Sequence, residues 1–249
     1  MKLPRARANA PQIPVGDDGL FMPTSLRPVR VRSRTIPVDS HFEPHHHAWA
    51  QLACCVTGVL QLTVAQNAPA PGPADGGGPA QSPIQTTYIV PPSRAVWIPP
   101  GDLHAINVLE TAEFRTLYIH PGVVPAGWRS ARVIVVSGLI RELIQALDAP
   151  ADLQDAATQD ASATRERERL LTTLLLDEIT HATTQALGVP MPSPHHGDKR
   201  LRVLCNAVMR APGERATLAE WAADIGASER TLQRWIDQTQ KRSRMLSLK

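Results

Sequence analysis

The stretch TLAEWAADIGASERTLQRWI, residues 217–236, specifies two helices joined by a turn. Thr217 and Glu220 have the spacing of a capping box, which starts a helix, and Gly226 favours the end of that helix. Ser228 is then placed to cap a second helix. Two helices separated by a short turn that contains glycine form the helix-turn-helix arrangement. The pattern therefore predicts a small α-helical domain in this part of the chain.

The second of these helices is expected to have one apolar and one polar face. Leu232, Trp235 and Ile236 follow the i, i+3, i+4 spacing of a face that packs on the first helix. Arg and Gln side chains on the opposite face are able to reach guanine and adenine edges in a major groove. The alternative is an ordinary helical hairpin with a solvated face. The residues expected to contact DNA are Ser228, Arg230, Gln233 and Arg234.

Basic residues are concentrated at the same end of the chain. Residues 198–249 hold 11 of the 26 Lys and Arg residues but only 6 of the 23 Asp and Glu residues. A local basic surplus suits a polyanionic partner, although a surplus of this size is also common on solvated surfaces. The charge therefore supports DNA binding only together with the helix pattern.

The segment LAEWAADIGASERTLQRWI resembles the first of the two helix-turn-helix motifs of AraC-type transcriptional regulators. This resemblance implies operator DNA as a partner and a homodimer as the working form. Members of the family usually carry a second motif towards the C-terminus. We expect that second motif to be missing, so that residues 198–249 form a truncated DNA-binding domain.

Residues 35–130 have the pattern of short strands separated by turns. The segments QLACCVTGVLQLTVA (51–65) and RAVWI (94–98) are rich in residues that favour strands, and PPSR and PPGD form turns. Further strands are expected at 88–90, 105–109 and 114–119. Residues 67–83 are nearly all Ala, Pro, Gly and polar, so we expect a flexible excursion there. Regularly spaced short strands indicate a barrel or a sandwich.

Three histidines in this region have an informative spacing. His45 and His47 alternate along the chain and so share one face of a strand, whereas His46 points away. Together with PPGDLH, which ends at His104, they resemble the two cupin motifs, in which histidines and a carboxylate hold a divalent metal inside a small barrel. The resemblance implies a metal site at His45, His47, Gln51 and His104, with Gln51 standing where the family has Glu. Zinc, nickel or iron would suit such ligands.

An alternative of equal weight is that the barrel binds a small organic effector and holds no metal. In that case the histidines line a pocket, and Trp49 and Trp97 are candidates for its walls. The order HHHAWAQL followed by AVWIPPGDLHAINV also resembles AraC-type regulators that have an N-terminal cupin domain. That combination implies a protein that responds to a small-molecule or metal effector.

The remaining segments complete the expected domain organisation. Residues 1–34 mix Pro and Arg without a secretory signal and are expected to be a disordered arm. Residues 131–197 are expected to be a helical linker or dimerisation region, with helices at 137–147 and 165–187 and a proline-rich linker at 188–197. No window is apolar enough to cross a membrane, and the three cysteines do not make a disulfide framework. We therefore expect a cytoplasmic protein that does not bind membranes.

These observations predict an α+β chain. A cupin β-barrel of jelly-roll type is followed by a helical linker and an α-helical helix-turn-helix domain. The expected function is a DNA-binding transcriptional regulator and not an enzyme. Two alternatives stay open: a metal-dependent cupin enzyme of the dioxygenase or isomerase type, and a remnant that no longer binds DNA.

Overall fold

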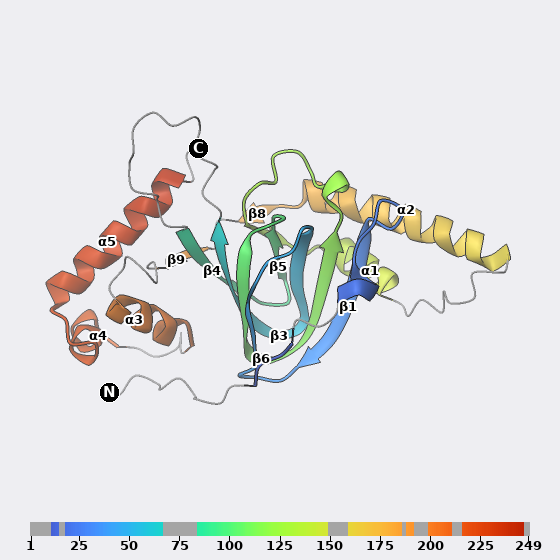
Figure 1. Ribbon diagram of the computed structural model, residues 1–249. Helices are drawn as coiled ribbons and strands as arrows, with labels where there is room; N and C mark the ends of the chain where they lie inside the picture. Colours follow the sequence, from blue (N-terminus) through green and yellow to red (C-terminus); the bar gives the residue numbers. More distant parts are fainter. Residues whose placement is uncertain are drawn as a thin grey trace. The chain divides into compact units, whose positions relative to one another are not determined.

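The structure is a computed structural model that describes residues 11–14, 18–66, 84–148, 159–185, 188–191, 199–210 and 216–246 (Figure 1). These residues form two compact units. The barrel unit takes the described residues of Pro11–Val64 and Tyr88–Gly188. The helical unit comprises the described residues of Val189–Lys249 together with those of Ala65–Thr87, which end one strand and begin the next.

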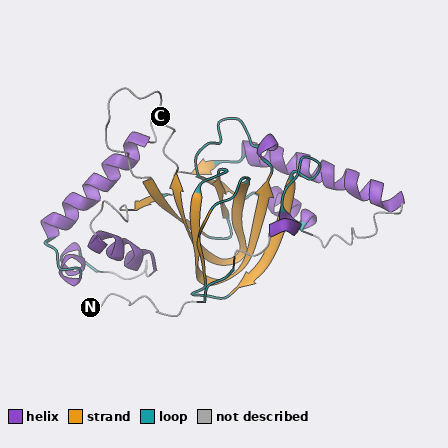
Figure 2. Cartoon of the chain, viewed as in Figure 1, coloured by secondary structure: helices purple, strands orange, loops and turns teal. Residues whose placement is uncertain are grey.

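The barrel unit is built on a mostly antiparallel sheet, shown in orange in Figure 2. Its strands pair in the order β1-β6-β3-β5-β7-β8, with β2 added to β6 and β4 added to β3. The bounds are β1 Val29–Ile36, β2 His41–His45, β3 Ala50–Gln66, β4 Ile84–Val90, β5 Arg94–Ile98, β6 Leu103–Ile119, β7 Arg132–Val135 and β8 Thr184–Gln185. The expected strands at 105–109 and 114–119 are thus parts of one long strand, β6.

The long strands β3 and β6 approach closely at Gly58. This residue has a φ of +79°, and a Cβ added to it would overlap the carbonyl group of Thr111 in β6. Only glycine satisfies both the backbone angle and the lack of space. Gly58 therefore allows the two strands to pair along their length.

One face of the sheet is covered by helices α1 (Gly138–Leu147) and α2 (Gln159–His181). Ser137 caps α1, because its hydroxyl accepts a hydrogen bond from the backbone N–H of Ile140 at 3.1 Å. The buried side chains of both helices pack on strand residues in a single apolar cluster that includes Ile140, Leu143, Ile144, Leu175, Ile179, Leu52, Trp97 and Leu117. We call this side of the sheet the helix-covered face.

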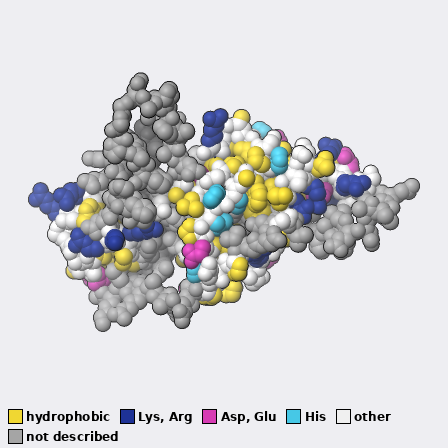
Figure 3. Space-filling view, in the orientation of Figure 1, with side chains coloured by type: hydrophobic (Ala, Val, Ile, Leu, Met, Phe, Trp, Pro, Cys, Tyr) yellow, Lys and Arg dark blue, Asp and Glu magenta, His cyan; other side chains and the backbone are white. Residues whose placement is uncertain are grey.

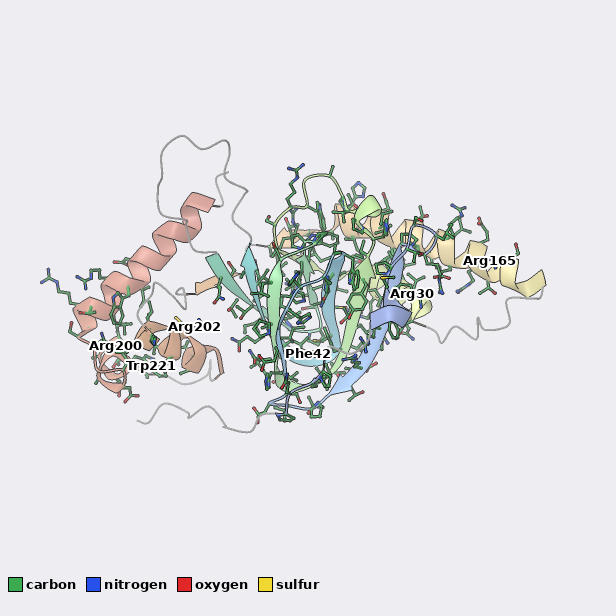
Figure 4. All side chains as sticks on the ribbon, in the orientation of Figure 1. Arg30, Phe42, Arg165, Arg200, Arg202 and Trp221 are labelled. Carbon is green, nitrogen blue, oxygen red and sulfur yellow. The ribbon has the colours of Figure 1, made fainter. Side chains whose placement is uncertain are left out.

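The opposite side, which we call the pocket face, carries a second apolar cluster. It includes Phe42, Val96, Ile98, Ile106 and Phe114. Phe42 is labelled in Figure 4, among the strands of the barrel unit. Because side chains alternate between the two faces of a strand, each strand contributes to both clusters.

The structure corrects three of the expected boundaries. Residues 29–34 belong to β1, where Val and Arg alternate between buried and half-buried positions, so the expected disordered arm was wrong for these residues. The second helix ends at His181 and is followed by β8. Part of the expected linker forms strand β9 (Val189–Met191), which pairs with β4. The excursion at 67–83 and the rest of the linker lie outside the described residues.

The helical unit contains α3 (Lys199–Arg210), α4 (Leu218–Asp224) and α5 (Glu229–Leu246). The capping box is confirmed: Glu220 N–H donates to the Thr217 hydroxyl at 3.3 Å, and Thr217 N–H donates to the Glu220 carboxylate at 2.7 Å. Gly226 follows with a φ of +65°, and the hydroxyl of Ser228 accepts a hydrogen bond from Thr231 N–H at 3.2 Å. The two helices and their turn therefore form as the local sequence predicts.

An apolar cluster holds these three helices together. It includes Leu201, Leu204, Trp221, Ile225 and Leu232, with Trp235 and Ile236 packed against it. Trp221 is labelled in Figure 4 together with Arg200 and Arg202 of α3. Arg200 donates to the carbonyl of Gly226 at 2.7 Å and lies 5.2 Å from the centre of the Trp235 ring, which ties α3 to the turn and to α5. Within the described residues, no helix is long and apolar enough to cross a membrane.

Candidate functional site

The pairing of β2 with β6 brings the predicted histidines together. His45 lies opposite His104 in the sheet, and their ring centres are 4.3 Å apart. The His47 ring lies 5.1 Å from His104 and 6.2 Å from His45. The backbone N–H of Gly101 also donates to the carbonyl of His47 at 2.9 Å, which joins the two histidine segments. Figure 3 shows several histidine side chains (cyan) beside hydrophobic ones (yellow) on the barrel unit.

His104 is a neutral, buried imidazole. Burial, and then the nearby His45, lower the pKa of His104 to about 3. Its Nδ1 lies 2.9 Å from the carbonyl oxygen of Asp102, which only accepts, so the proton is on Nδ1. The other nitrogen, Nε2, therefore carries a lone pair, and it is buried without a hydrogen-bond partner among the described residues.

Both ring nitrogens of His47 are hydrogen-bonded in the observed arrangement. Its Nδ1 lies 2.7 Å from the carbonyl oxygen of Trp49, so Nδ1 must donate. Its Nε2 lies 2.8 Å from the side-chain oxygen Oε1 of Gln51. If the ring is neutral, Nε2 accepts, and the amide must present its NH₂ group there. If the ring is charged, Nε2 itself donates. In either arrangement Nε2 is engaged in the contact with Gln51.

The predicted ligand set therefore does not fit a metal ion as it stands. Imidazole binds a metal through a free lone pair, and a neutral amide is a weaker ligand than the carboxylate of the cupin pattern. His45 uses Nδ1 in a 2.8 Å contact with the carbonyl of Glu43. Among the described residues, no group of three or more His, Cys, Asp or Glu side chains is placed to hold a metal.

The two tryptophans occupy different faces of the sheet. Trp49 stacks on His47, with ring centres 5.1 Å apart and planes 9° apart, and lies 5.9 Å from Tyr118. Trp97 is fully buried on the helix-covered face, where its Nε1–H donates to the carbonyl of Trp128 at 3.2 Å. The expectation that Trp97 walls the histidine pocket is corrected, because it pairs with Leu52 and so faces away from Gln51.

A hollow opens on the pocket face beside the histidines. Its lining combines basic, polar and aromatic side chains from four strands: Arg32, Arg34, Phe42, His45, Gln51, Ile106, Phe114, Thr116 and Tyr118. The contribution of β1 was not expected from the sequence, because its arginines lie in the segment expected to be a disordered arm. The signal was the alternation in VRVRSRTI, which places Arg32 and Arg34 on one face.

The predicted DNA-contacting residues lie at the start of α5. Ser228, Arg230, Gln233 and Arg234 are all exposed, whereas Leu232 between them is fully buried in the helical cluster. Gln233 donates to the carboxylate of Asp237 one turn later at 3.1 Å. The apolar and polar faces are thus separated as the spacing predicts.

Comparison with known proteins identifies the family. The model of the AraC-like ligand-binding domain matches residues 28–176. The chain is also 30% identical over 199 residues to the HTH-type transcriptional regulator NimR of Escherichia coli (strain K12), an alignment that spans 78% of this chain and 68% of the relative. The chain belongs to the AraC-type family of transcriptional regulators. The barrel unit of this AraC-type chain is thus a cupin sensor domain.

Solved structures with detectable similarity come from several kinds of protein. A conserved protein of unknown function from Streptococcus pyogenes has 14% identity and a TM-score of 0.29, over 38% of this chain and 66% of its own. Oxalate decarboxylase from Bacillus subtilis has 18% identity and a TM-score of 0.29, over 58% of this chain and 31% of its own. The AraC-type chain thus spans less than two thirds of the length of each of these proteins.

Proposed function

We propose that this AraC-type chain is a DNA-binding transcriptional regulator in which the barrel unit binds a small effector. The single observation that carries the DNA-binding part is the arrangement of α5. Arg230, Gln233 and Arg234 are exposed together on the side opposite the buried Leu232. A helix with this polarity is able to enter a major groove while its apolar side stays packed in the domain.

The sensing part rests on the hollow beside the histidines. It combines hydrogen-bonding groups such as Gln51 and Tyr118 with apolar side chains such as Phe42 and Phe114. Sites for small molecules typically have this mixture, in which apolar groups supply affinity and a few polar groups fix orientation. We propose an organic effector, because both ring nitrogens of His47 are hydrogen-bonded and Gln51 stands where the cupin metal pattern has a carboxylate.

The same reasoning disfavours the alternative of a metal-dependent enzyme. An oxygenase or isomerase of the cupin type would require at least three free ligands around one ion. Here His47 is hydrogen-bonded through both ring nitrogens. We propose that the barrel senses its ligand and does not transform it, and that the protein works in the cytoplasm, where its DNA partner is found.

The test is selection of bound sequences from random DNA by the full chain, followed by footprinting of the enriched sequence. The selection is done at low salt, where phosphate contacts raise affinity for all DNA. We expect enrichment of a defined sequence. Replacing Arg234 by Ala should lower the preference for it by about 1 to 3 kcal/mol, the usual value of a bidentate contact to guanine.

The matched control is Arg141→Ala, which removes the same charge from an exposed position on α1 in the barrel unit. It should leave the sequence preference unchanged. Failure of the full chain to enrich any sequence would overturn the proposal. An unchanged preference in Arg234→Ala would remove Arg234 from the contact surface.

A further inference from the structure

The exposed face of α5 (red in Figure 1) carries a carboxylate among the residues proposed to contact DNA. Four exposed polar residues follow the i, i+3, i+4, i+7 spacing of one helical stripe: Arg230, Gln233, Arg234 and Asp237. A negative charge on a DNA-contacting face repels phosphate groups and so lowers the affinity for all DNA. The position of Asp237 on this face therefore points to another role.

Asp237 holds the side-chain amide of Gln233. Nε2 of Gln233 donates to Oδ1 of Asp237 at 3.1 Å, one turn along the helix. An ionised carboxylate only accepts hydrogen bonds, so the amide has to present its nitrogen to Asp237, and its oxygen Oε1 points away. This bond uses one of the two amide N–H groups. In the part of the chain that the structure describes, the other N–H and Oε1 remain as a donor and an acceptor side by side.

A neighbouring donor and acceptor match one base edge in the major groove. Adenine presents the acceptor N7 beside the donor N6–H₂, whereas guanine presents two acceptors, cytosine a donor, and thymine an acceptor beside its methyl group. The charge of Asp237 further disfavours guanine, because O6 and N7 of guanine are both electron-rich. The amide of Gln233, oriented in this way, therefore favours adenine.

The hydrogen bond also orders the Gln233 side chain before DNA binds. A long side chain that is already ordered loses less rotamer freedom in a complex, so more of the energy of its contacts appears as affinity. Arg234 lies three residues before Asp237, within reach of an ion pair. Among the described residues, however, the carboxylate is bonded by Gln233 and not by Arg234, so the guanidinium group is not withdrawn from DNA.

We propose that Asp237 is a positioning residue that orients the Gln233 amide for paired hydrogen bonds to an adenine. The proposal rests on the proposed DNA-binding function and specifies one base that α5 reads. Asp237 acts through Gln233 and does not itself contact the base. Its negative charge lowers the affinity for all DNA, while its hydrogen bond raises the discrimination between bases.

The test uses the full chain and the sequence that it enriches from random DNA. Each position of that sequence is changed to the other three bases, and dissociation constants are measured by fluorescence anisotropy at one fixed salt concentration. We expect one position at which adenine is preferred and at which Gln233→Ala lowers the preference about tenfold or more. Asp237→Ala should lower the same preference about threefold, the effect of losing the ordered side chain.

Two substitutions of Asp237 separate its charge from its hydrogen bond. Asp237→Asn keeps an acceptor for the Gln233 amide and should retain most of the adenine preference, whereas Asp237→Ala should not. Both variants should bind DNA of unrelated sequence more tightly, because a negative charge is removed. Asp237→Ala should therefore bind DNA more tightly in general and yet discriminate less, and a misfolded variant would not combine these two changes.

The matched control is Glu229→Gln. Glu229 precedes Gln233 by four residues, as Asp237 follows it by four, and Glu229 is also exposed on α5. Its replacement should raise the affinity for unrelated DNA and leave the adenine preference unchanged. A measurement without DNA completes the test: the side-chain amide NMR signals of Gln233, assigned by their loss in Gln233→Ala, should shift more in Asp237→Ala than in Glu229→Gln.

Three results would overturn the proposal while leaving the DNA-binding function in place. They are an enriched sequence with no adenine preference that depends on Gln233, an unchanged adenine preference in Asp237→Ala, and an equal loss of that preference in Glu229→Gln. Failure of the full chain to enrich any sequence would instead overturn the DNA-binding function together with the role of Asp237.

Discussion

Gln51 stands where the cupin metal pattern has a carboxylate. Its amide is 2.8 Å from Nε2 of His47, and the His47 ring is also fixed by the carbonyl of Trp49. A carboxylate at this position would bring a negative charge and a stronger metal ligand in place of a neutral amide. The chemistry of the cluster therefore depends on one side chain.

We predict that Gln51→Glu creates a site for a divalent transition metal. The carboxylate is a stronger, charged ligand than the amide, so His47, His45 and His104 are able to converge on an ion with it. Added nickel or zinc should raise the melting temperature of the variant, with a stabilisation of about 3 kcal/mol at a metal concentration about 100 times the dissociation constant. The wild type should show no such rise, and elemental analysis should give one ion per variant chain only.

Two further variants check that prediction. His47→Ala in the Gln51→Glu background should abolish metal binding, whereas His46→Ala, at the exposed neighbouring position, should preserve it. Stoichiometric metal in the wild-type protein, lost on His47→Ala, would show that the amide does not block the site. Our account of Gln51 would then be wrong.

At the scale of an element, α4 depends on the hydrogen bonds at its first turn. The helix is short, from Leu218 to Asp224, and the reciprocal bonds of Thr217 and Glu220 satisfy donors that would otherwise have no partner. Helices of this length do not form by propensity alone, so the cap and the packing of Trp221 both matter. The capping box is thus expected to control the local stability of α4.

We predict that Thr217→Ala destabilises α4 by about 1 kcal/mol, the typical cost of losing an N-cap side chain. Backbone amides of residues 218–224 should exchange with deuterium several times faster, as followed by mass spectrometry. Thr180→Ala is the control, because Thr180 is exposed in α2 and its hydroxyl only donates to the carbonyl of Leu176 in the same helix. Unchanged exchange in α4 of Thr217→Ala would mean that packing alone maintains the helix.

At the scale of the whole molecule, α1 and α2 leave large apolar side chains in contact with solvent. Leu139 is 45% exposed, Leu170 is 54% exposed and Leu174 is 43% exposed, although neighbouring positions on both helices are buried against the sheet. Exposed apolar side chains grouped on helices commonly mark a contact between subunits. Regulators that read symmetric or repeated sites also generally need two subunits.

We predict that the full chain is a homodimer and that α2 contributes to its interface. Leu170→Glu combined with Leu174→Glu should raise the dimer dissociation constant on the order of tenfold or more, because charged groups would be buried without partners. Sedimentation equilibrium measures this constant. Leu103→Glu, at an apolar position of β6 that is 40% exposed, is the control and should leave the dimer intact. A monomeric wild type at tens of micromolar would contradict the prediction.

The sequence by itself determined the features that depend on neighbouring residues. The capping box at Thr217, the turn at Gly226 and the separation of Leu232 from Arg230 and Arg234 all follow from spacings of a few residues. The alternation of His45 and His47 likewise predicted a shared face. These patterns also carried the resemblance that identified the family, because a motif of local contacts is read directly along the chain.

Only the tertiary structure decided which distant side chains meet. The register of β1 against β6 brings Arg32 and Arg34 to the hollow, and the pairing of β3 with β5 turns Trp97 to the helix-covered face. A shift of one residue in either pairing would reverse these assignments, and the segments concerned lie far apart in the chain. The sequence identifies Gln51 as a departure from the cupin pattern. Its contact with His47 depends on the tertiary structure, which residue spacing does not specify. Residue type and spacing therefore predicted the elements and the family, whereas strand register set the chemistry of the pocket.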